Sequence, residues 1–171
     1  MYNKLKNNSI TRILFVCLGN ICRSPAAEAV MKHLVEERNL SHLFYINSAG
    51  IGAWHTGQLP DKRMRVQGAA RGYLFDHRAQ QVKREDFLRY DYLIGMDDEN
   101  IHDLRRLATD KEQADKIICL ANYLQKYAGE PTIPDPYYGG TKDFIRALDL
   151  IEDACKGLLD ALTEAQYRNE Y

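Results

Sequence analysis

The amino-acid sequence predicts an α/β protein, a single three-layer α/β/α domain with a central four-stranded parallel sheet. Short apolar runs typical of buried strands alternate along the chain with longer segments whose apolar residues recur at helical spacing. Strands that alternate with helices form βαβ units, which place helices on both faces of a mostly parallel sheet. The chain also contains no repeat and no linker-like tract that would divide it. Ligands bind such sheets at the carboxyl ends of the strands, so function is expected in the loops that follow them.

The first predicted strand covers residues 12–17, a continuous apolar run that indicates burial on both faces. A helix is expected to open at Ser24 and Pro25, because proline suits the first helical position, where its missing N–H is not needed. The helix has an apolar face and a polar face, formed respectively by Ala27, Val30, Met31, Leu34 and Val35 and by Glu28, Lys32, Glu36 and Glu37.

Three further strands are predicted at residues 43–48, 90–96 and 116–120, the last of them buried. A weaker helix is expected after Pro60 and Asp61, and another helix after the third strand, capped by Asp97 or Asp98. Residues 129–140 contain three prolines and three glycines, which predicts a loop. The last helix is indicated by one apolar stripe, formed by Phe144, Leu148, Ile151, Cys155, Leu158 and Leu162.

Length and charge set the broad class of the protein. We expect a domain at residues 11–165, between a polar N-terminal extension at 1–10 and a polar C-terminal tail at 166–171. The 23 Lys and Arg residues balance 24 Asp and Glu residues, which argues against a nucleic-acid-binding surface. No apolar run approaches the roughly 18 residues of a membrane helix. We therefore expect a cytoplasmic protein without a membrane span, present as a monomer or weak homodimer.

The four cysteines fit neither a disulfide framework nor a zinc site. Cys119, in the fourth predicted strand, and Cys155, on the last helix, are expected in the core, because free cysteine packs as a small hydrophobic residue. Four histidines fit no catalytic triad or metal spacing and are expected to be solvated: His33, His42, His55 and His102. We expect neither a metal nor a cofactor.

The loop after the first strand carries the strongest functional pattern, a cysteine and an arginine separated by five residues and followed by a helix. Such a loop directs successive backbone N–H groups inward and forms a cradle for an anion. Gly19 and Asn20 tolerate the left-handed backbone angles that this curl requires. Arg23 can bind two phosphate oxygens with its planar guanidinium group. The phosphate-binding residues are therefore expected to be Leu18, Gly19, Asn20, Ile21, Cys22, Arg23 and Ser24.

The same environment predicts the chemistry of Cys17. A sulfur beside a guanidinium at a helix N-terminus is favoured as the thiolate, which is the form that accepts a phosphoryl group. Asp135 lies between Pro134 and Pro136, which stiffen its backbone, and it is a candidate acid for the leaving oxygen. From the residues alone, a solvated aspartate in a turn is an equal interpretation of Asp135.

Two motifs together resemble a known family, the low-molecular-weight protein-tyrosine phosphatases. The motifs are Val16-Cys17-Leu18-Gly19-Asn20-Ile21-Cys22-Arg23-Ser24-Pro25 and Asp135-Pro136-Tyr137-Tyr138. The resemblance implies a flavodoxin-like phosphotyrosine phosphatase I fold and hydrolysis of protein phosphotyrosine and small aryl phosphates. It implies a phospho-cysteine intermediate at Cys17, phosphate binding by Arg23, and a role for Asp135 as general acid and then general base.

The resemblance also implies roles for residues around the loop. Tyr137 and Tyr138 would line the cleft against the substrate ring, and Trp54 would shape substrate choice unless it packs in the core. Ser24 would hydrogen-bond the cysteine sulfur, although a helix N-cap is the alternative. The polar residues that fix the loop's shape would be Asn20, Ser48 and His77.

For three further residues the sequence leaves the role or its consequence open. Asp97 could orient Arg23 or only cap a helix. Asn47 departs from the family pattern, which usually has Asp there, and the departure removes a charge expected near the cleft rim. Cys22 lies five residues from Cys17, and we hypothesise that oxidation joins the two in a reversible disulfide, the alternative being that Cys22 only packs.

Three other functions share parts of this pattern. A disulfide-cycling arsenate reductase of the same fold needs a further cysteine pair, but no cysteine occurs between Arg23 and Lys116. A protein-arginine phosphatase typically has Thr where this chain has Ile21. A non-catalytic phosphopeptide-binding module would be expected to lose Cys17 or Asp135, and both are present.

Overall fold

The structure, a computed structural model that describes residues 9–167, is built on a four-stranded parallel sheet. The strands are β1 (Thr11–Cys17), β2 (Phe44–Gly50), β3 (Tyr92–Gly95) and β4 (Ile117–Cys119), in the order β2-β1-β3-β4. The chain adds strands to one side of β1 and then to the other, so a crevice forms at the carboxyl ends of β1 and β3. The predicted fold class is confirmed.

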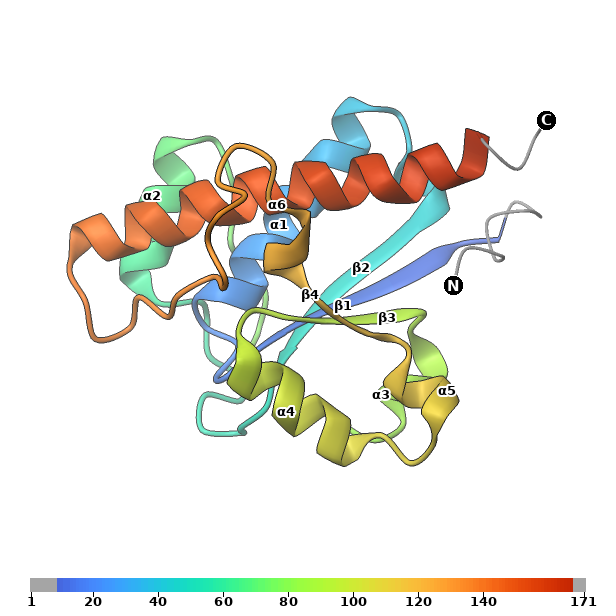
Figure 1. The fold of residues 1–171 in the computed structure, drawn as a ribbon. Coiled ribbons are helices and arrows are strands. Elements are labelled where there is room, and N and C mark those ends of the chain that lie inside the picture. Colours follow the sequence, from blue (N-terminus) through green and yellow to red (C-terminus); the bar gives the residue numbers. More distant parts are fainter. Residues whose placement is uncertain (1–8, 168–171) are drawn as a thin grey trace.

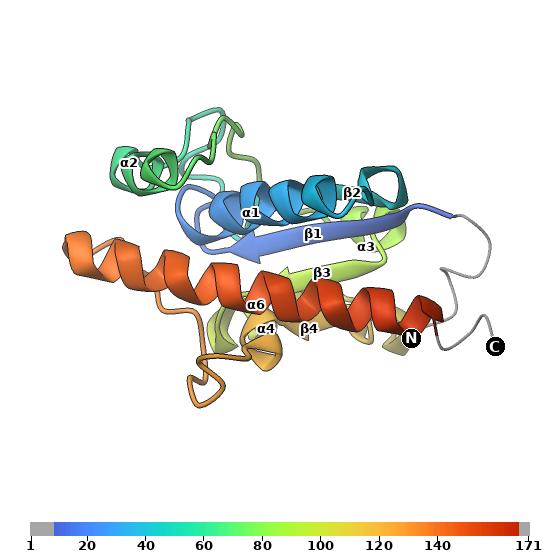
Figure 2. The same cartoon turned by 90° about the horizontal axis from the view of Figure 1, so that it is seen from above.

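Helices cover both faces of this sheet (Figures 1 and 2). One face carries α1 (Arg23–Glu37), α2 (Lys62–Ala70) and α6 (Thr141–Tyr167), and the other carries α3 (Asp86–Arg89), α4 (Asp98–Leu107) and α5 (Lys111–Ala114). Two short 3₁₀ turns, η2 (Ser41–Leu43) and η3 (Leu120–Tyr123), precede β2 and follow β4. Within residues 9–167, no helix combines the length and the apolar character needed to cross a membrane.

Alternation along β1 divides the core into two layers. Ile13 and Phe15 belong to the larger cluster beneath α1 and α6, whereas Leu14 and Val16 belong to the smaller cluster on the side of α3 and α4. Successive side chains of a strand point to opposite faces, so a strand covered by helices on both faces is apolar throughout. This arrangement explains the continuous apolar run that predicted the strand.

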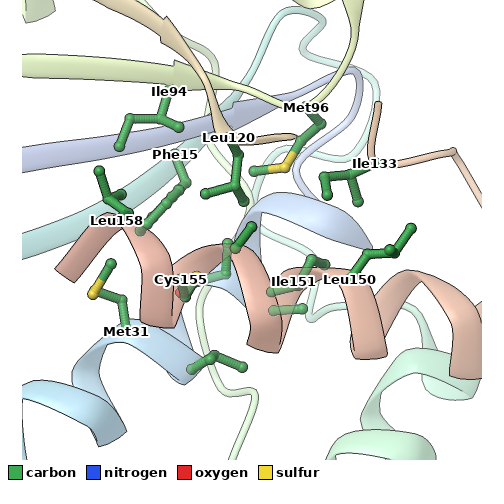
Figure 3. Packing of buried hydrophobic residues seen from close by; sticks show 14 of the residues in the cluster. Phe15, Met31, Ile94, Met96, Leu120, Ile133, Leu150, Ile151, Cys155 and Leu158 are labelled. Carbon is green, nitrogen blue, oxygen red and sulfur yellow. The ribbon is translucent and has the colours of Figure 1, made fainter. Parts of the chain in front are cut away.

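The apolar stripe of α6 packs against the sheet and against α1, which lies beside α6 on the same face (Figures 2 and 3). Ile151, Cys155 and Leu158 are fully buried there, close to Phe15 of β1 and Met31 of α1. The burial of Cys155 raises the pKa of its thiol, so the group stays protonated and behaves as an apolar side chain. The prediction that Cys155 lies in the core is therefore confirmed.

Several local predictions differ from the structure. α1 begins at Arg23, so Pro25 is the third helical residue rather than the first, although it still lies in the turn whose N–H groups have no intrahelical acceptor. Glu28, expected on the solvated face of α1, is buried. β4 is only half-buried, and Cys119 with it, because it is the edge strand beside β3.

Other predictions agree or lie beyond the described residues. His33, His42 and His102 are exposed, as expected. The predicted extension at 1–10 and tail at 166–171 fall mostly outside residues 9–167.

Candidate active site

The loop from Cys17 to Ser24, called the phosphate loop below, joins the end of β1 to the start of α1. Its curl depends on Asn20, whose φ of 58° lies in the left-handed region predicted for this position. Gly19, in contrast, has a negative φ. A glycine fits at this position for a steric reason, because a Cβ there would lie only 3.0 Å from the His55 ring. The prediction is therefore confirmed for Asn20 and wrong for Gly19.

The side chain of Asn20 is buried and holds the loop from within. Its Nδ2 donates to the hydroxyls of Ser24 at 2.8 Å and Ser48 at 3.0 Å. Its Oδ1 accepts from the backbone N–H of Gln80 at 3.0 Å and lies 2.8 Å from His77 Nε2. The predicted polar group of Asn20, Ser48 and His77 is thus brought together, and Gln80 is an additional member.

His77 links this group to the buried carboxylate of Glu28. The His77 Nδ1 atom lies 3.1 Å from Glu28 Oε1, which also accepts from the Ser48 hydroxyl at 2.9 Å. Lys32 donates to the other oxygen of Glu28 at 2.9 Å. Because His77 faces an acceptor at each ring nitrogen, both contacts are hydrogen bonds only when both nitrogens carry a proton. Burial alone would raise the pKa of Glu28, but hydrogen bonds from His77 and Lys32 lower it.

Cys17 is 3% exposed, and its Sγ lies 3.0 Å from the hydroxyl of Ser24. The N-cap of α1 is Cys22 and Ser24 is the second helical residue, so the Ser24 hydroxyl serves Cys17, Asn20 and the carbonyl of Ala49. Of the two alternatives for Ser24, the contact with the sulfur is the one that the structure contains.

The guanidinium group of Arg23 is buried beside the sulfur. Its Nη1 donates to Asp97 Oδ2 at 2.6 Å and to the carbonyl of Ile133 at 2.9 Å, while its Nη2 lies 3.5 Å from Asp135 Oδ2. Burial alone would lower the pKa of Arg23, but the charges of Cys17 and Asp97 raise it above its ordinary value. Arg23 is therefore a permanent cation at the opening of the phosphate loop.

A cavity of about 320 Å³ opens over the phosphate loop. Its walls are formed by Cys17, Leu18, Gly19, Ile21, Cys22, Arg23, Trp54, His55, Asp135, Tyr137 and Tyr138. The loop residues Cys17 and Arg23 are buried, whereas Trp54 is 69% exposed and Tyr138 is 95% exposed. The aromatic side chains therefore lie at the outer rim, and the alternative that Trp54 packs in the core is wrong.

Sequence reasoning missed several residues of this site. His55 was expected to be solvated, yet it is half-buried, lines the cavity and lies with its ring centroid 6.4 Å from that of Tyr137. Glu28 has no sequence signal, because a charged residue at that helical spacing resembles a solvated one. The family resemblance indicated His77 as a partner of Asn20, but nothing in the sequence indicated Gln80.

Asn47 lies away from the cleft, which corrects the expectation for this residue. Its Nδ2 lies 3.2 Å from the hydroxyl of Tyr90, and its Oδ1 accepts from the N–H of Ser48. Asn47 pairs with Leu14 in the register of β1 and β2, and Tyr90 packs with Leu14 on the face opposite α1. The departure from the family pattern therefore changes a hydrogen bond under the sheet.

No cluster of three His, Cys, Asp or Glu side chains suited to a metal ion occurs within residues 9–167. The features described above are a cysteine sulfur on a curled loop at a helix start, a guanidinium group fixed by two hydrogen bonds, and a carboxylate that lines the same cavity. Together they define a site of the cysteine-dependent phosphatase class.

Comparisons with known proteins assign the family. The sequence profile described as low molecular weight phosphotyrosine protein phosphatase matches residues 12–168, and the chain belongs to this family. It is 44% identical over 154 residues to a low molecular weight protein-tyrosine-phosphatase of Streptomyces coelicolor, which covers 90% of this chain and 94% of the relative. The resemblance inferred from the two motifs is confirmed.

Solved structures agree with this assignment. A protein tyrosine phosphatase from Entamoeba histolytica, crystallised with Hepes in its active site, superposes with a TM-score of 0.87 at 41% identity and covers 91% of this chain and 99% of that one. A Drosophila arginine phosphatase superposes with a TM-score of 0.81 at 34% identity and covers 87% and 96%.

Proposed function

We propose that this protein hydrolyses phosphotyrosine in proteins, and small aryl phosphates, through a phospho-cysteine intermediate at Cys17. The observation that carries the proposal is the convergence of Cys17, Arg23 and Asp135 on one cavity. In this arrangement the anion cradle that binds the phosphate also surrounds the nucleophile. An aryl phosphate bound there places its phosphorus over the sulfur and its leaving oxygen toward Asp135.

In the first step, the Cys17 thiolate attacks phosphorus and the bond from phosphorus to the phenolic oxygen breaks. Protonated Asp135 transfers its proton to the leaving oxygen, so the products are phospho-Cys17 and a neutral phenol. The backbone N–H groups of the phosphate loop and the Arg23 guanidinium stabilise the equatorial oxygens as charge spreads over them.

In the second step, Asp135, now a carboxylate, removes a proton from a water molecule that attacks the phosphorus. The bond from phosphorus to sulfur breaks, inorganic phosphate leaves and Asp135 is protonated again. Ser24, 3.0 Å from the sulfur, donates a hydrogen bond that stabilises the departing thiolate. Both steps therefore proceed with groups of this chain and one water molecule.

The rim of the cavity favours an aromatic substrate. Tyr137 and Trp54 provide ring surfaces beside the opening, and Tyr138 packs edge-on against Tyr137 with centroids 4.9 Å apart. Flat aromatic walls match the ring of phosphotyrosine by stacking and by burial of apolar surface. Because the mechanism needs Cys17 as a free thiolate, we infer the reducing cytoplasm as the compartment of the protein.

Assays with p-nitrophenyl phosphate and a phosphotyrosine peptide test the proposal. We expect turnover in the presence of a metal chelator, its abolition by Cys17→Ser, and a decrease in kcat of about 10²-fold or more for Asp135→Ala. The control variant Cys119→Ser alters a half-buried thiol at the end of β4 and should keep the activity. Wild-type turnover by Cys17→Ser would show that the mechanism is wrong.

The similarity to an arginine phosphatase calls for a comparison of the two substrates. Ile21 lines the cavity and is 8% exposed, so its side chain presents an apolar surface where the arginine-specific branch typically has a threonine. We expect the protein to prefer phosphotyrosine over phosphoarginine, and Ile21→Thr to reduce that preference. A wild-type preference for phosphoarginine would favour the alternative function.

A further inference from the structure

Arg63, in the first turn of α2, connects two segments of the site. Its guanidinium group binds Asp61 twice, from Nε to Oδ1 at 3.0 Å and from Nη2 to Oδ2 at 2.9 Å. The same Nη2 atom donates to the backbone carbonyl of Tyr137 at 3.0 Å. The Cζ atom of Arg63 also lies over two rings, 5.5 Å from the centroid of Tyr137 and 4.5 Å from that of Phe144.

The residue whose carbonyl Arg63 contacts, Tyr137, also binds Asp135 through its N–H. The N–H of Tyr137 donates to Asp135 Oδ1 at 3.1 Å, while its carbonyl accepts from Arg63. Asp135 is 36% exposed on its side chain, and its other oxygen is 3.5 Å from Arg23, beyond ordinary hydrogen-bond length. The orientation of the carboxylate therefore depends on where the backbone of Tyr137 lies.

Asp61 ties this contact to the phosphate loop. Its backbone N–H donates to the carbonyl of Ile21 at 2.7 Å, and its Oδ1 accepts from the N–H of Arg63 as the cap of α2. Its side chain is 13% exposed, and hydrogen bonds from Arg63 lower the pKa of its carboxyl group. A series of hydrogen bonds thus connects Ile21 of the phosphate loop, through Asp61 and Arg63, to the loop that carries Asp135.

We infer that Arg63 is a positioning residue that sets the placement of Asp135 relative to the phosphate loop. The inference rests on the proposed function, since it concerns the residue that protonates the leaving oxygen. A planar guanidinium with five N–H groups can bind a carboxylate through two atoms and a carbonyl through one of them, while stacking on a ring. Lysine lacks this planar fork, and methionine keeps only the length and apolar contact.

The dependence of rate on the leaving group separates positioning of the acid from a general structural effect. Phenyl phosphate has a basic leaving oxygen that needs protonation, whereas p-nitrophenyl phosphate has a good leaving group that needs it less. We expect Arg63→Met to lower kcat/KM for phenyl phosphate about 10-fold more than for p-nitrophenyl phosphate, because misplacement by about 1 Å is costly in catalysis. Arg63→Lys should show the same pattern with a smaller difference.

Arg65→Met is the matched control. Arg65 is in the same helix and also donates to a backbone carbonyl, that of Pro60, so its replacement removes a comparable contact at the start of α2. It should leave the ratio of the two rates at the wild-type value. Thermal unfolding of each variant shows whether the fold is kept, and Arg63→Lys serves as the test if Arg63→Met does not fold.

Two outcomes distinguish this inference from the proposed function. Equal losses on both substrates in the Arg63 variants, or no loss, would overturn the positioning role while the wild-type enzyme remained active. A wild-type protein without activity on either aryl phosphate would instead overturn the proposed function itself.

Discussion

Asp97 binds the guanidinium group of Arg23 through one carboxylate oxygen and caps α4 through the other. The Oδ2 atom accepts from Arg23 at 2.6 Å, and the Oδ1 atom accepts from the N–H of Asn100 at 2.8 Å. The two roles left open by the sequence are therefore filled by the same side chain. The helix cap fixes the carboxylate, and the carboxylate in turn fixes the direction of the buried cation.

Replacing Asp97 with Asn should separate these two roles. Asparagine caps helices as well as aspartate, so the melting temperature should change little. The bond to Arg23 loses its charge, and we expect kcat/KM to fall about 10-fold, which corresponds to about 1.4 kcal/mol. Asp110→Asn, at the cap of α5, is the control and should leave turnover unchanged. Equal turnover by the Asp97→Asn and wild-type enzymes would contradict the orienting role.

The close approach of β2 to the phosphate loop predicts a steric effect at Gly50. A Cβ at this position would lie 2.9 Å from the backbone nitrogen of Asn20, an approach that the loop cannot accommodate without moving. We expect Gly50→Ala to lower the free energy of unfolding by about 1–3 kcal/mol and to reduce the affinity for inorganic phosphate. Gly129→Ala, where the Cβ meets only open space, should change neither quantity. A neutral Gly50→Ala would mean that the loop adjusts freely.

Glu28 should contribute a pH-dependent part of the stability. Its pKa in the folded protein lies below the ordinary value of 4.5, because the hydrogen bonds from His77 and Lys32 outweigh burial. As the pH falls, Glu28 therefore becomes protonated at a higher pH in the unfolded chain than in the folded protein. The stabilisation is complete above the unfolded pKa and is lost as the pH drops through the folded pKa.

Urea unfolding at neutral pH and at about pH 3.5 measures this contribution. At neutral pH, Glu28→Gln should be less stable than the wild type by about 1–3 kcal/mol, because its buried partners lose a charged acceptor. The difference between the two proteins should shrink at the acidic pH. Glu36→Gln, at an exposed position of α1, should follow the wild type at both pH values. A gap that stays constant with pH would rule out this linkage.

Cys22 should protect Cys17 from irreversible oxidation. Burial, followed by the nearby charge of Asp61, raises the pKa of the Cys22 thiol, so peroxide should oxidise Cys17 first, to a sulfenic acid. The Cys22 sulfur then displaces water from that sulfur, its proton leaves with the water and the disulfide forms. We expect mild peroxide to remove two hydrogens from the mass of the protein and a thiol reductant to restore the activity.

The same treatment of Cys22→Ser should leave a smaller recoverable fraction of that variant's own starting activity. Cys155→Ser is the control, since Cys155 is fully buried in the core beneath α6. Sulfinic acid on Cys17 of the wild type, without an intramolecular bond, would show that Cys22 only packs.

The elements that the sequence predicted well are those whose pattern is local. For the strand before Cys17 and for the stripe of α6, the order of apolar residues along the chain directly indicates which side chains are buried. The five residues between Cys17 and Arg23 likewise correspond to the length of the phosphate loop. The edge position of β4 was not predictable in this way. Burial of that strand depends on which neighbour pairs with it, which short apolar runs do not encode.

The residues that were missed act through contacts between distant segments. Glu28 resembles a solvated helix residue until His77 is placed beside it, and His55 becomes a cavity residue only because Gly19 lets its ring approach. Arg63 likewise has a role only through the carbonyl of Tyr137. Contacts of this kind depend on how distant segments pack around the sheet. The local sequence therefore predicts the phosphate loop but not the residues that hold it in place from other segments.

The hydrogen bond from Arg23 to the carbonyl of Ile133 joins positions 110 residues apart in the sequence. During synthesis the cradle and α1 emerge first, and the cation within them lacks this acceptor until the segment after β4 has left the ribosome. The same late segment carries Asp135, so we expect turnover to require it. A shortened chain that ends before that segment would keep Cys17 but lose both this acceptor and Asp135, and we expect it to be inactive.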